Sequence, residues 1–127
     1  MSKLFDALQF AADGLIPVII AEADTQRALT LCYMNRDALE ATLATGKVHV
    51  FRRSKGRLMI KGETSGHIQE VRRVFADCEG KSVLMLVKQH VAGCHQGYMS
   101  CYFREYDRKA DDFKVSEPQV FDPKKVY

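Results

Sequence analysis

Residues 15–33 read LIPVIIAEADTQRALTLCY, two apolar runs on either side of a polar turn. The first run, Leu15 to Ala23, is rich in isoleucine and valine and predicts a buried strand. Pro17 should lie near the start of that strand or on an edge, because proline has no N–H to donate. The second run, Arg27 to Tyr33, predicts another strand. With Asp24-Thr25-Gln26 as the turn, the two runs predict a β-hairpin.

A helix is predicted directly after this hairpin. Asn35 is a typical N-cap, and Gly46 stands where a glycine ends a helix. Between them, residues 36–45 place apolar and small side chains on one face: Ala38, Leu39, Thr42 and Leu43. A shorter helix is predicted within residues 3–12.

The rest of the chain predicts mainly strands. They cover residues 47–52, 57–61, 68–76, 82–89 and 100–106, and the apolar run 82–89 is expected to be central in its sheet. Many strands with one main helix predict an α+β fold built on a mixed or antiparallel sheet.

Length and composition predict one globular domain. The chain has 127 residues, 46% of them hydrophobic, and no apolar run of the roughly 18 residues that a membrane span needs. Asp6 stands where a signal peptide would be apolar, so we expect a cytoplasmic protein without a membrane partner. After Tyr106 the chain becomes polar. We therefore divide it into a domain, residues 1–106, and a polar C-terminal tail, residues 107–127, which is expected to be extended.

Three of the four cysteines form a group: Cys78, Cys94 and Cys101. Thiolates favour zinc, and three protein ligands leave a position for a water that the metal activates near neutral pH. The alternative is that they are small buried apolar residues. We expect the remaining cysteine, Cys32, to be a core residue because it lies in an apolar strand.

A basic segment, residues 47–73, holds eight bases and two acids. It contains the run Lys61-Gly62-Glu63-Thr64-Ser65-Gly66, whose glycines let backbone N–H groups approach an anion and whose hydroxyls add donors. Arg53 and Ser54 precede it and offer a second clamp. The segment predicts a phosphorylated small molecule as ligand, with a solvated basic hairpin as the alternative. Nucleic acid is not expected, because few aromatic residues lie among these bases.

Two histidines are candidates for acid–base catalysis. His67 follows the glycine-rich run, and His95 adjoins Cys94. Adjacent side chains on an extended loop point apart, so Cys94 and His95 are not expected to bind one ion together. Asp77 and Glu79 flank Cys78 and carry the oxygen ligands that magnesium prefers, whereas Lys81 argues against such an ion.

Several of these motifs together resemble the phosphoribosyl-AMP cyclohydrolase family. The likeness spans about residues 8–104 and rests on these runs in order: Gly14-Leu15-Ile16-Pro17, Tyr33-Met34-Asn35, Lys61-Gly62-Glu63-Thr64-Ser65-Gly66-His67, Asp77-Cys78, Cys94-His95 and Ser100-Cys101. The resemblance implies hydrolysis of the N1–C6 bond in the adenine ring of phosphoribosyl-AMP by a zinc-activated water, the third step of histidine biosynthesis.

The same resemblance implies an intertwined homodimer and a set of site residues. The zinc ligands would be Cys78, Cys94 and Cys101, contributed across the subunit interface, and His67 or His95 would be the acid. The substrate-binding residues would be Asn35, Arg53, Ser54, Lys61, Gly62, Glu63, Thr64, Ser65 and Gly66. A magnesium ion would lie at Asp77 and Glu79.

The sequence departs from the family pattern at the magnesium motif. The family usually has Asp-Cys-Asp-x-Asp, whereas this chain has Asp77-Cys78-Glu79-Gly80-Lys81. Two other functions stay open. One is a related zinc hydrolase acting on another phosphorylated purine. The other is a non-catalytic, zinc-stapled dimer that binds a nucleotide or RNA.

Overall fold

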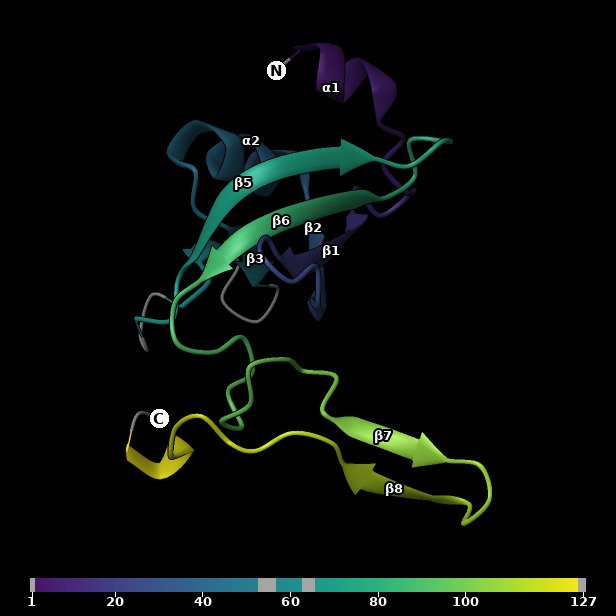
Figure 1. The fold of residues 1–127 in the computed structure, drawn as a ribbon. Helices are drawn as coiled ribbons and strands as arrows, with labels where there is room; N and C mark the ends of the chain where they lie inside the picture. The colour runs from purple at the N-terminus through teal and green to yellow at the C-terminus, as the bar shows by residue number, and fades with distance from the viewer. Residues whose placement is uncertain (1, 53–56, 63–65, 126–127) are drawn as a thin grey trace.

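A four-stranded mixed sheet carries the core in the computed structural model, which describes residues 2–52, 57–62 and 66–125 (Figure 1). The strand order is β2-β1-β6-β5, with β1 (Ile16–Glu22), β2 (Ala28–Met34), β5 (Gln69–Ala76) and β6 (Val83–Gln89). β1 runs antiparallel to β2 and parallel to β6, and β5 runs antiparallel to β6. The predicted α+β fold is confirmed.

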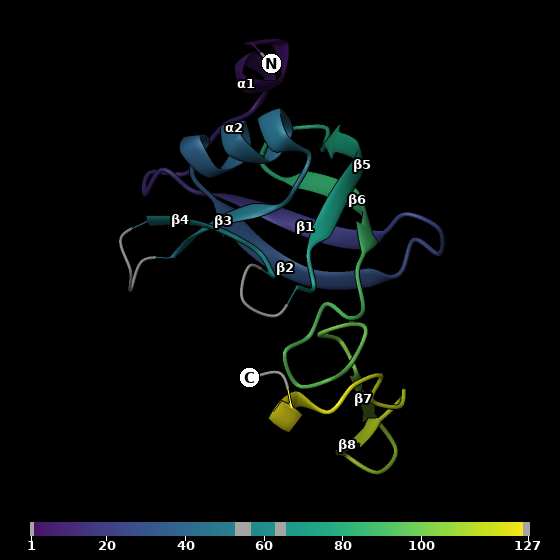
Figure 2. The same cartoon turned by 90° about the vertical axis from the view of Figure 1, so that its left-hand side faces the viewer.

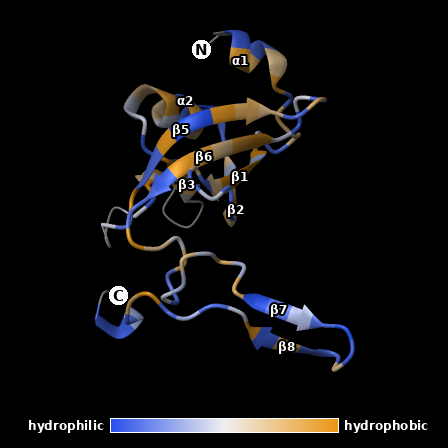
Figure 3. Cartoon of the chain, in the orientation of Figure 1, coloured by the Kyte–Doolittle hydropathy of each residue, from blue (hydrophilic) through white to orange (hydrophobic). Residues whose placement is uncertain are grey.

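The predicted hairpin is present as β1 and β2, paired from Ile16↔Met34 to Ala21↔Ala28. The predicted central strand is β6, which has a neighbour on each side. Figure 3 shows why: β6 is apolar along most of its length and becomes polar only at its end, Lys88 and Gln89. A strand that is apolar along most of its length is favoured at an interior position, where a neighbouring strand covers each of its edges.

The predicted main helix is α2 (Arg36–Thr45), with the predicted bounds. Asn35 caps its first turn, since its Oδ1 accepts a hydrogen bond from the Ala38 N–H at 2.8 Å. Gly46 ends it in the left-handed region, at φ 77°. The first helix, α1 (Ser2–Ala7), is shorter than the predicted segment because the Gln9 N–H bonds to the Gly80 carbonyl instead, at 2.7 Å.

The core lies on one face of this sheet, under α2 and a second hairpin, β3 (His49–Arg52) and β4 (Arg57–Ile60) (Figure 2). Alternate residues of β1 point into it, namely Ile16, Val18 and Ile20, all fully buried. Leu39 of α2 and Val48 are also fully buried in this cluster. None of the helices among the described residues is long and apolar enough to span a membrane.

The opposite face of the sheet carries an exposed apolar row. Ile19 pairs with Leu31 on one side and with Leu84 on the other, and Leu84 pairs with Phe75. Ile19, Leu31 and Phe75 are 42%, 44% and 38% exposed. The row (Leu31, Ile19, Leu84 and Phe75) therefore crosses all four strands without a cover from the described part of this chain.

The C-terminal region differs from its prediction. The predicted strand 100–106 is wrong in extent: β7 covers only Arg104–Asp107 and pairs with β8 (Asp112–Val115). Ser100 and Cys101 do not extend β7, because their polar groups bond to the carbonyls of Ala28 and Leu29. The predicted extended tail is also wrong, since it contains β8 and a short 3-10 helix, η2 (Pro123–Lys125). The domain division at residue 106 stays a prediction.

Candidate active site

Two of the predicted zinc ligands, Cys94 and Cys101, form a thiol pair at the end of the sheet where β6 finishes. Cys101 lies close enough to Cys94 to act on the pKa of the Cys94 thiol. Burial raises the pKa of the Cys94 thiol above its ordinary value, and the neighbouring Cys101 adds to that rise. Two soft sulfur donors side by side fit two positions of a zinc site.

The loop that carries this pair is fixed by its own backbone. The Gly93 N–H bonds to the Met99 carbonyl at 2.8 Å, and the Cys94 N–H bonds to the Tyr98 carbonyl at 3.1 Å. A Cβ on Gly93 would lie only 2.9 Å from the Met99 carbonyl oxygen. This close approach of the two chain segments therefore requires glycine at position 93. The loop thereby brings residues 94 and 101 together.

The far side of this loop is attached to the end of the β1–β2 hairpin. The Cys101 N–H bonds to the Leu29 carbonyl at 2.7 Å, and the Ser100 hydroxyl donates to the Ala28 carbonyl at 2.7 Å. Arg27 pairs with Glu117 at 3.0 Å, which attaches the C-terminal region to the same place. The position of Cys101 thus depends on β2 as well as on its own loop.

The third predicted ligand, Cys78, lies at the opposite end of the sheet. It is exposed in the turn between β5 and β6, whereas Cys94 follows the other end of β6 (Figure 1). β6 has seven residues, so its length alone separates the two ends by roughly 20 Å. Within the described part of one chain, no three metal-binding side chains come together. One chain therefore does not assemble the predicted cysteine set.

The glycine-rich run returns to the thiol end of the sheet. The Gly66 N–H bonds to the Gly62 carbonyl at 2.7 Å, which closes the loop between Lys61 and His67. A Cβ on Gly62, where φ is 85°, would lie 2.3 Å from the His67 carbonyl oxygen. Five predicted binding residues lie outside the described residues: Arg53, Ser54, Glu63, Thr64 and Ser65.

Gln89 links the His67 segment to the loop of the thiol pair. Its Nε2 donates to the carbonyls of His67, His90 and Ala92, each at 3.1 Å. Its Oε1 accepts from the Gln69 Nε2 at 2.6 Å. Both glutamines are buried. A single buried side chain therefore holds the two predicted site segments next to each other.

The two candidate histidines have different surroundings. His67 is buried, and its ring contacts Phe121 edge-on, with 4.7 Å between ring centroids. Burial lowers the pKa of His67, so its imidazole is neutral at neutral pH. His95 is exposed while its neighbour Cys94 is buried, which agrees with the expectation that the two side chains point apart.

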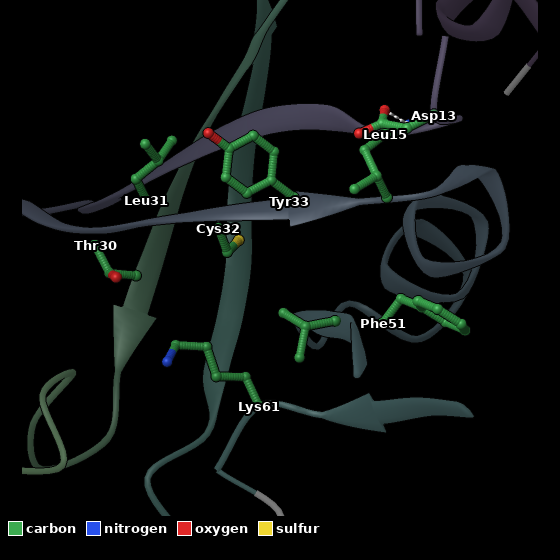
Figure 4. Close-up of a pocket in the computed structure, with 9 residues that line it drawn as sticks. Asp13, Leu15, Thr30, Leu31, Cys32, Tyr33, Phe51 and Lys61 are labelled. Atoms are coloured by element: carbon green, nitrogen blue, oxygen red, sulfur yellow. Dashed lines mark hydrogen bonds between the residues drawn. The ribbon is translucent and has the colours of Figure 1, made fainter. Parts of the chain in front are cut away.

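A pocket of about 610 Å³ opens beside Lys61, between the edge strand β2 and the β3–β4 hairpin (Figure 4). Its lining includes Lys61, Cys32, Tyr33 and Phe51. Burial raises the pKa of the Cys32 thiol to about 11, which keeps it protonated and agrees with a core role. None of the three candidate zinc ligands lines this pocket.

Asn35, Asp77 and Glu79 lie at the opposite end of the sheet, with Cys78. Asn35 is the cap of α2, and its Oδ1 is already bonded to the Ala38 N–H. The Asp77 Oδ1 accepts the backbone N–H groups of Glu79 and Lys81, at 3.1 and 2.9 Å. Hydrogen bonds from the Ser82 hydroxyl and from the turn backbone hold the pKa of Asp77 below its ordinary value.

Sequence reasoning missed two contributors to the thiol end of the sheet. Phe121 gives no local signal, because its contact with His67 joins residues far apart in the chain. Gln89 does give one: it is a polar residue at the end of an apolar strand and is buried. A buried amide has to find partners, so this position was a detectable site for a structural hydrogen-bond network.

Taken together, these features define a small α+β protein with a four-stranded mixed sheet, one main helix and two cysteines brought together at one end of the sheet. The family model of phosphoribosyl-AMP cyclohydrolase matches residues 30–103. Two phosphoribosyl-AMP cyclohydrolases are similar over most of the chain. The one from Nitratidesulfovibrio vulgaris is 49% identical, covering 91% of this chain and 91% of its own length. The one from Pelotomaculum thermopropionicum is 44% identical, covering 96% of this chain and 94% of its own length.

A third relative is longer. The histidine biosynthesis bifunctional protein of Thermoanaerobacter pseudethanolicus is 40% identical over 100% of this chain, which covers 58% of that protein. With two relatives matched along nearly their whole length and the family model matched over more than half the chain, this chain belongs to the phosphoribosyl-AMP cyclohydrolase family.

Proposed function

We propose that this protein hydrolyses the N1–C6 bond in the adenine ring of phosphoribosyl-AMP, within histidine biosynthesis and in the cytoplasm. Family membership supports the reaction. The observation that carries the site is that the Cys94–Cys101 pair and the His67 segment meet at one end of the sheet, joined through Gln89. The reaction adds the oxygen of water to C6 and a proton to N1, which opens the ring.

We propose zinc as the metal, held by Cys94 and Cys101 of one chain and by Cys78 of a second chain. The separation of Cys78 from the thiol pair supports sharing, because one chain cannot supply all three ligands. Three thiolates are a sufficient protein set for a catalytic zinc. When bound, the metal supplies a water that is nucleophilic near neutral pH.

The apolar row supports the second chain. A two-fold axis lying between two such faces, parallel to the sheets and perpendicular to their strands, would place the Cys78 end of one sheet over the thiol end of the other. Two such faces also bury each other's apolar side chains, which is the driving force a stable homodimer requires. We propose that the row is the centre of the dimer interface.

The proposed proton transfers use the two histidines. A neutral His67 imidazole can accept a proton from the attacking water, and burial keeps it neutral. His95 is exposed next to Cys94 and would deliver the proton to N1. Lys61 and the glycine-rich run offer an ammonium and backbone donors to the phosphates of the substrate. Positioning by these groups contributes to the rate along with the proton transfers.

Mixed subunits test the shared site directly. Cys78→Ser and Cys101→Ser proteins are each expected to lose zinc and turnover. When they are unfolded together and refolded as mixed dimers, one of the two sites in each heterodimer receives all three cysteines. The mixture should therefore recover part of the wild-type turnover, measured as the absorbance change of ring opening.

One further mixture serves as the control. Cys94→Ser mixed with Cys101→Ser should recover nothing, because both lesions lie on the same side of the shared site. Recovery there, or its absence from the first mixture, would refute the shared assignment. Zinc-loaded wild-type protein that does not turn over phosphoribosyl-AMP would refute the proposed reaction itself.

A further inference from the structure

The Asp77–Ser82 turn does not have the donor set of a magnesium site. Magnesium demands near-ideal octahedral geometry and usually keeps several waters, so the one or two carboxylates that bind it have to be free to face the ion. The turn offers two carboxylates, Asp77 and Glu79, and both are engaged within the chain.

The Asp77 carboxylate closes the turn. Its Oδ1 accepts two backbone N–H groups, and its Oδ2 accepts the Ser82 hydroxyl at 2.7 Å. A carboxylate has about four lone-pair positions, so at least three of them are already used. Turning Asp77 toward an ion would release these donors and open the turn.

The Glu79 carboxylate faces an ammonium group. Its Oε2 lies 3.0 Å from the Nζ of Lys81, and both side chains are exposed. A divalent cation bound to Glu79 would therefore lie within a few ångströms of the Lys81 ammonium, and the repulsion between the two positive charges opposes its binding.

The backbone keeps this arrangement in place. Gly80, between Glu79 and Lys81, is buried and has φ 70°. A Cβ there would lie 2.0 Å from the Ala7 carbonyl oxygen, and the Gly80 carbonyl accepts the Gln9 N–H at 2.7 Å. The end of α1 thus holds the middle of the turn, with one charged side chain on each side of it.

We propose that this enzyme takes no magnesium at the Asp77–Lys81 turn, and that the Lys81 ammonium supplies the positive charge beside Glu79 instead. The proposal rests on the cyclohydrolase function proposed above only for its kinetic consequence, which is turnover that does not require magnesium. Its binding consequence stands alone: the wild-type turn does not bind a stoichiometric divalent cation of the kind that prefers oxygen ligands.

Manganese binding tests the proposal, because Mn²⁺ takes the same oxygen ligands as magnesium and its free fraction is measured by electron paramagnetic resonance. Zinc-saturated wild type, Lys81→Asp and Lys81→Ala are passed over a chelating resin column in zinc-only buffer and titrated with Mn²⁺. Lys81→Asp, which replaces the ammonium with a carboxylate, should bind one Mn²⁺ per chain at least about tenfold more tightly than wild type. Lys81→Ala separates removal of the ammonium from addition of a carboxylate and should fall between them.

Turnover of phosphoribosyl-AMP is then measured with zinc alone and with zinc plus magnesium. Added magnesium is expected to change the turnover rate of the wild type by less than about twofold, because no magnesium has to bind for the reaction. Two results would overturn the proposal. One is stoichiometric Mn²⁺ binding to wild type, if magnesium displaces the Mn²⁺ and Glu79→Gln removes the binding. The other is a strict need for magnesium in turnover. If the wild type is inactive under every condition, the proposed reaction is refuted. The manganese titration would still test whether the Asp77–Lys81 turn binds a divalent cation.

Discussion

Replacing Gln89 with methionine tests whether one buried amide holds the site together. Methionine keeps about the same length and volume but removes the two N–H donors of Nε2, which the carbonyls of His67, His90 and Ala92 share, and the oxygen that accepts from Gln69. A typical intramolecular hydrogen bond contributes about 1 kcal/mol, and buried groups left unpaired cost somewhat more. We therefore expect Gln89→Met to lower the free energy of unfolding by about 4 kcal/mol.

Gln69→Met is the matched control. It removes only the hydrogen bond to Gln89, and it also removes the Gln69 Oε1, a buried atom that has no partner among the described residues. The expected loss is about 1 kcal/mol or less. Both values come from urea unfolding of the zinc-loaded proteins, followed by far-ultraviolet circular dichroism.

The pair also separates stability from function. Gln89→Met frees the His67 carbonyl from the loop of the thiol pair, so kcat should fall at temperatures where the variant is fully folded. Gln69→Met should leave kcat near the wild-type value. Equal destabilisation by the two substitutions, or unchanged kcat in folded Gln89→Met, would refute the reasoning.

Four other substitutions or measurements follow from the same geometry. Gly62→Ala should reduce substrate affinity without changing zinc content by metal analysis, because its Cβ would collide with the His67 carbonyl. Phe121→Ala should expose His67 and raise its pKa toward the ordinary value. Because the proposed base is inactive when protonated, the acid limb of the kcat/KM profile should then move to higher pH. An unmoved limb would argue against His67 as the base. Cys32 should be the slowest of the four thiols to alkylate in zinc-free folded protein at pH 8, by peptide mass mapping, because its pKa is about 11. Ile19→Glu should give a monomer without zinc in sedimentation and metal analysis, and a zinc-loaded monomer would contradict the proposed interface.

The local elements were predictable because their signals are local. The β1–β2 hairpin follows from two apolar runs around a polar turn, and α2 follows from Asn35, Gly46 and the spacing between them. The C-terminal region was not predictable in the same way. Its strand starts at Arg104 rather than Ser100 because Ser100 and Cys101 bond to the end of β2, a contact between residues about 70 positions apart in the sequence.

The candidate site residues stay predictions, and their assembly within one chain was not predictable. The three cysteines read as one group because they are close in sequence. The predicted strands already indicate that Cys78 and Cys94 lie far apart. Cys78 lies in the turn before the strand 82–89 and Cys94 lies after it, so a fully extended segment separates them. The contact of Phe121 with His67 gave no such signal, because side-chain packing of a distant segment leaves no local pattern.

The close approach of α1 to Gly80 extends the influence of the N-terminus to the far end of the sheet. The first nine residues end against the turn that presents Cys78, through the Ala7 carbonyl and the Gln9 N–H. In the proposed dimer, a change in this segment, or a tag attached to it, would therefore alter how one subunit presents Cys78 to the next without altering a proposed ligand. In that proposed dimer, α1 would affect activity although none of its side chains is a proposed ligand or catalytic group.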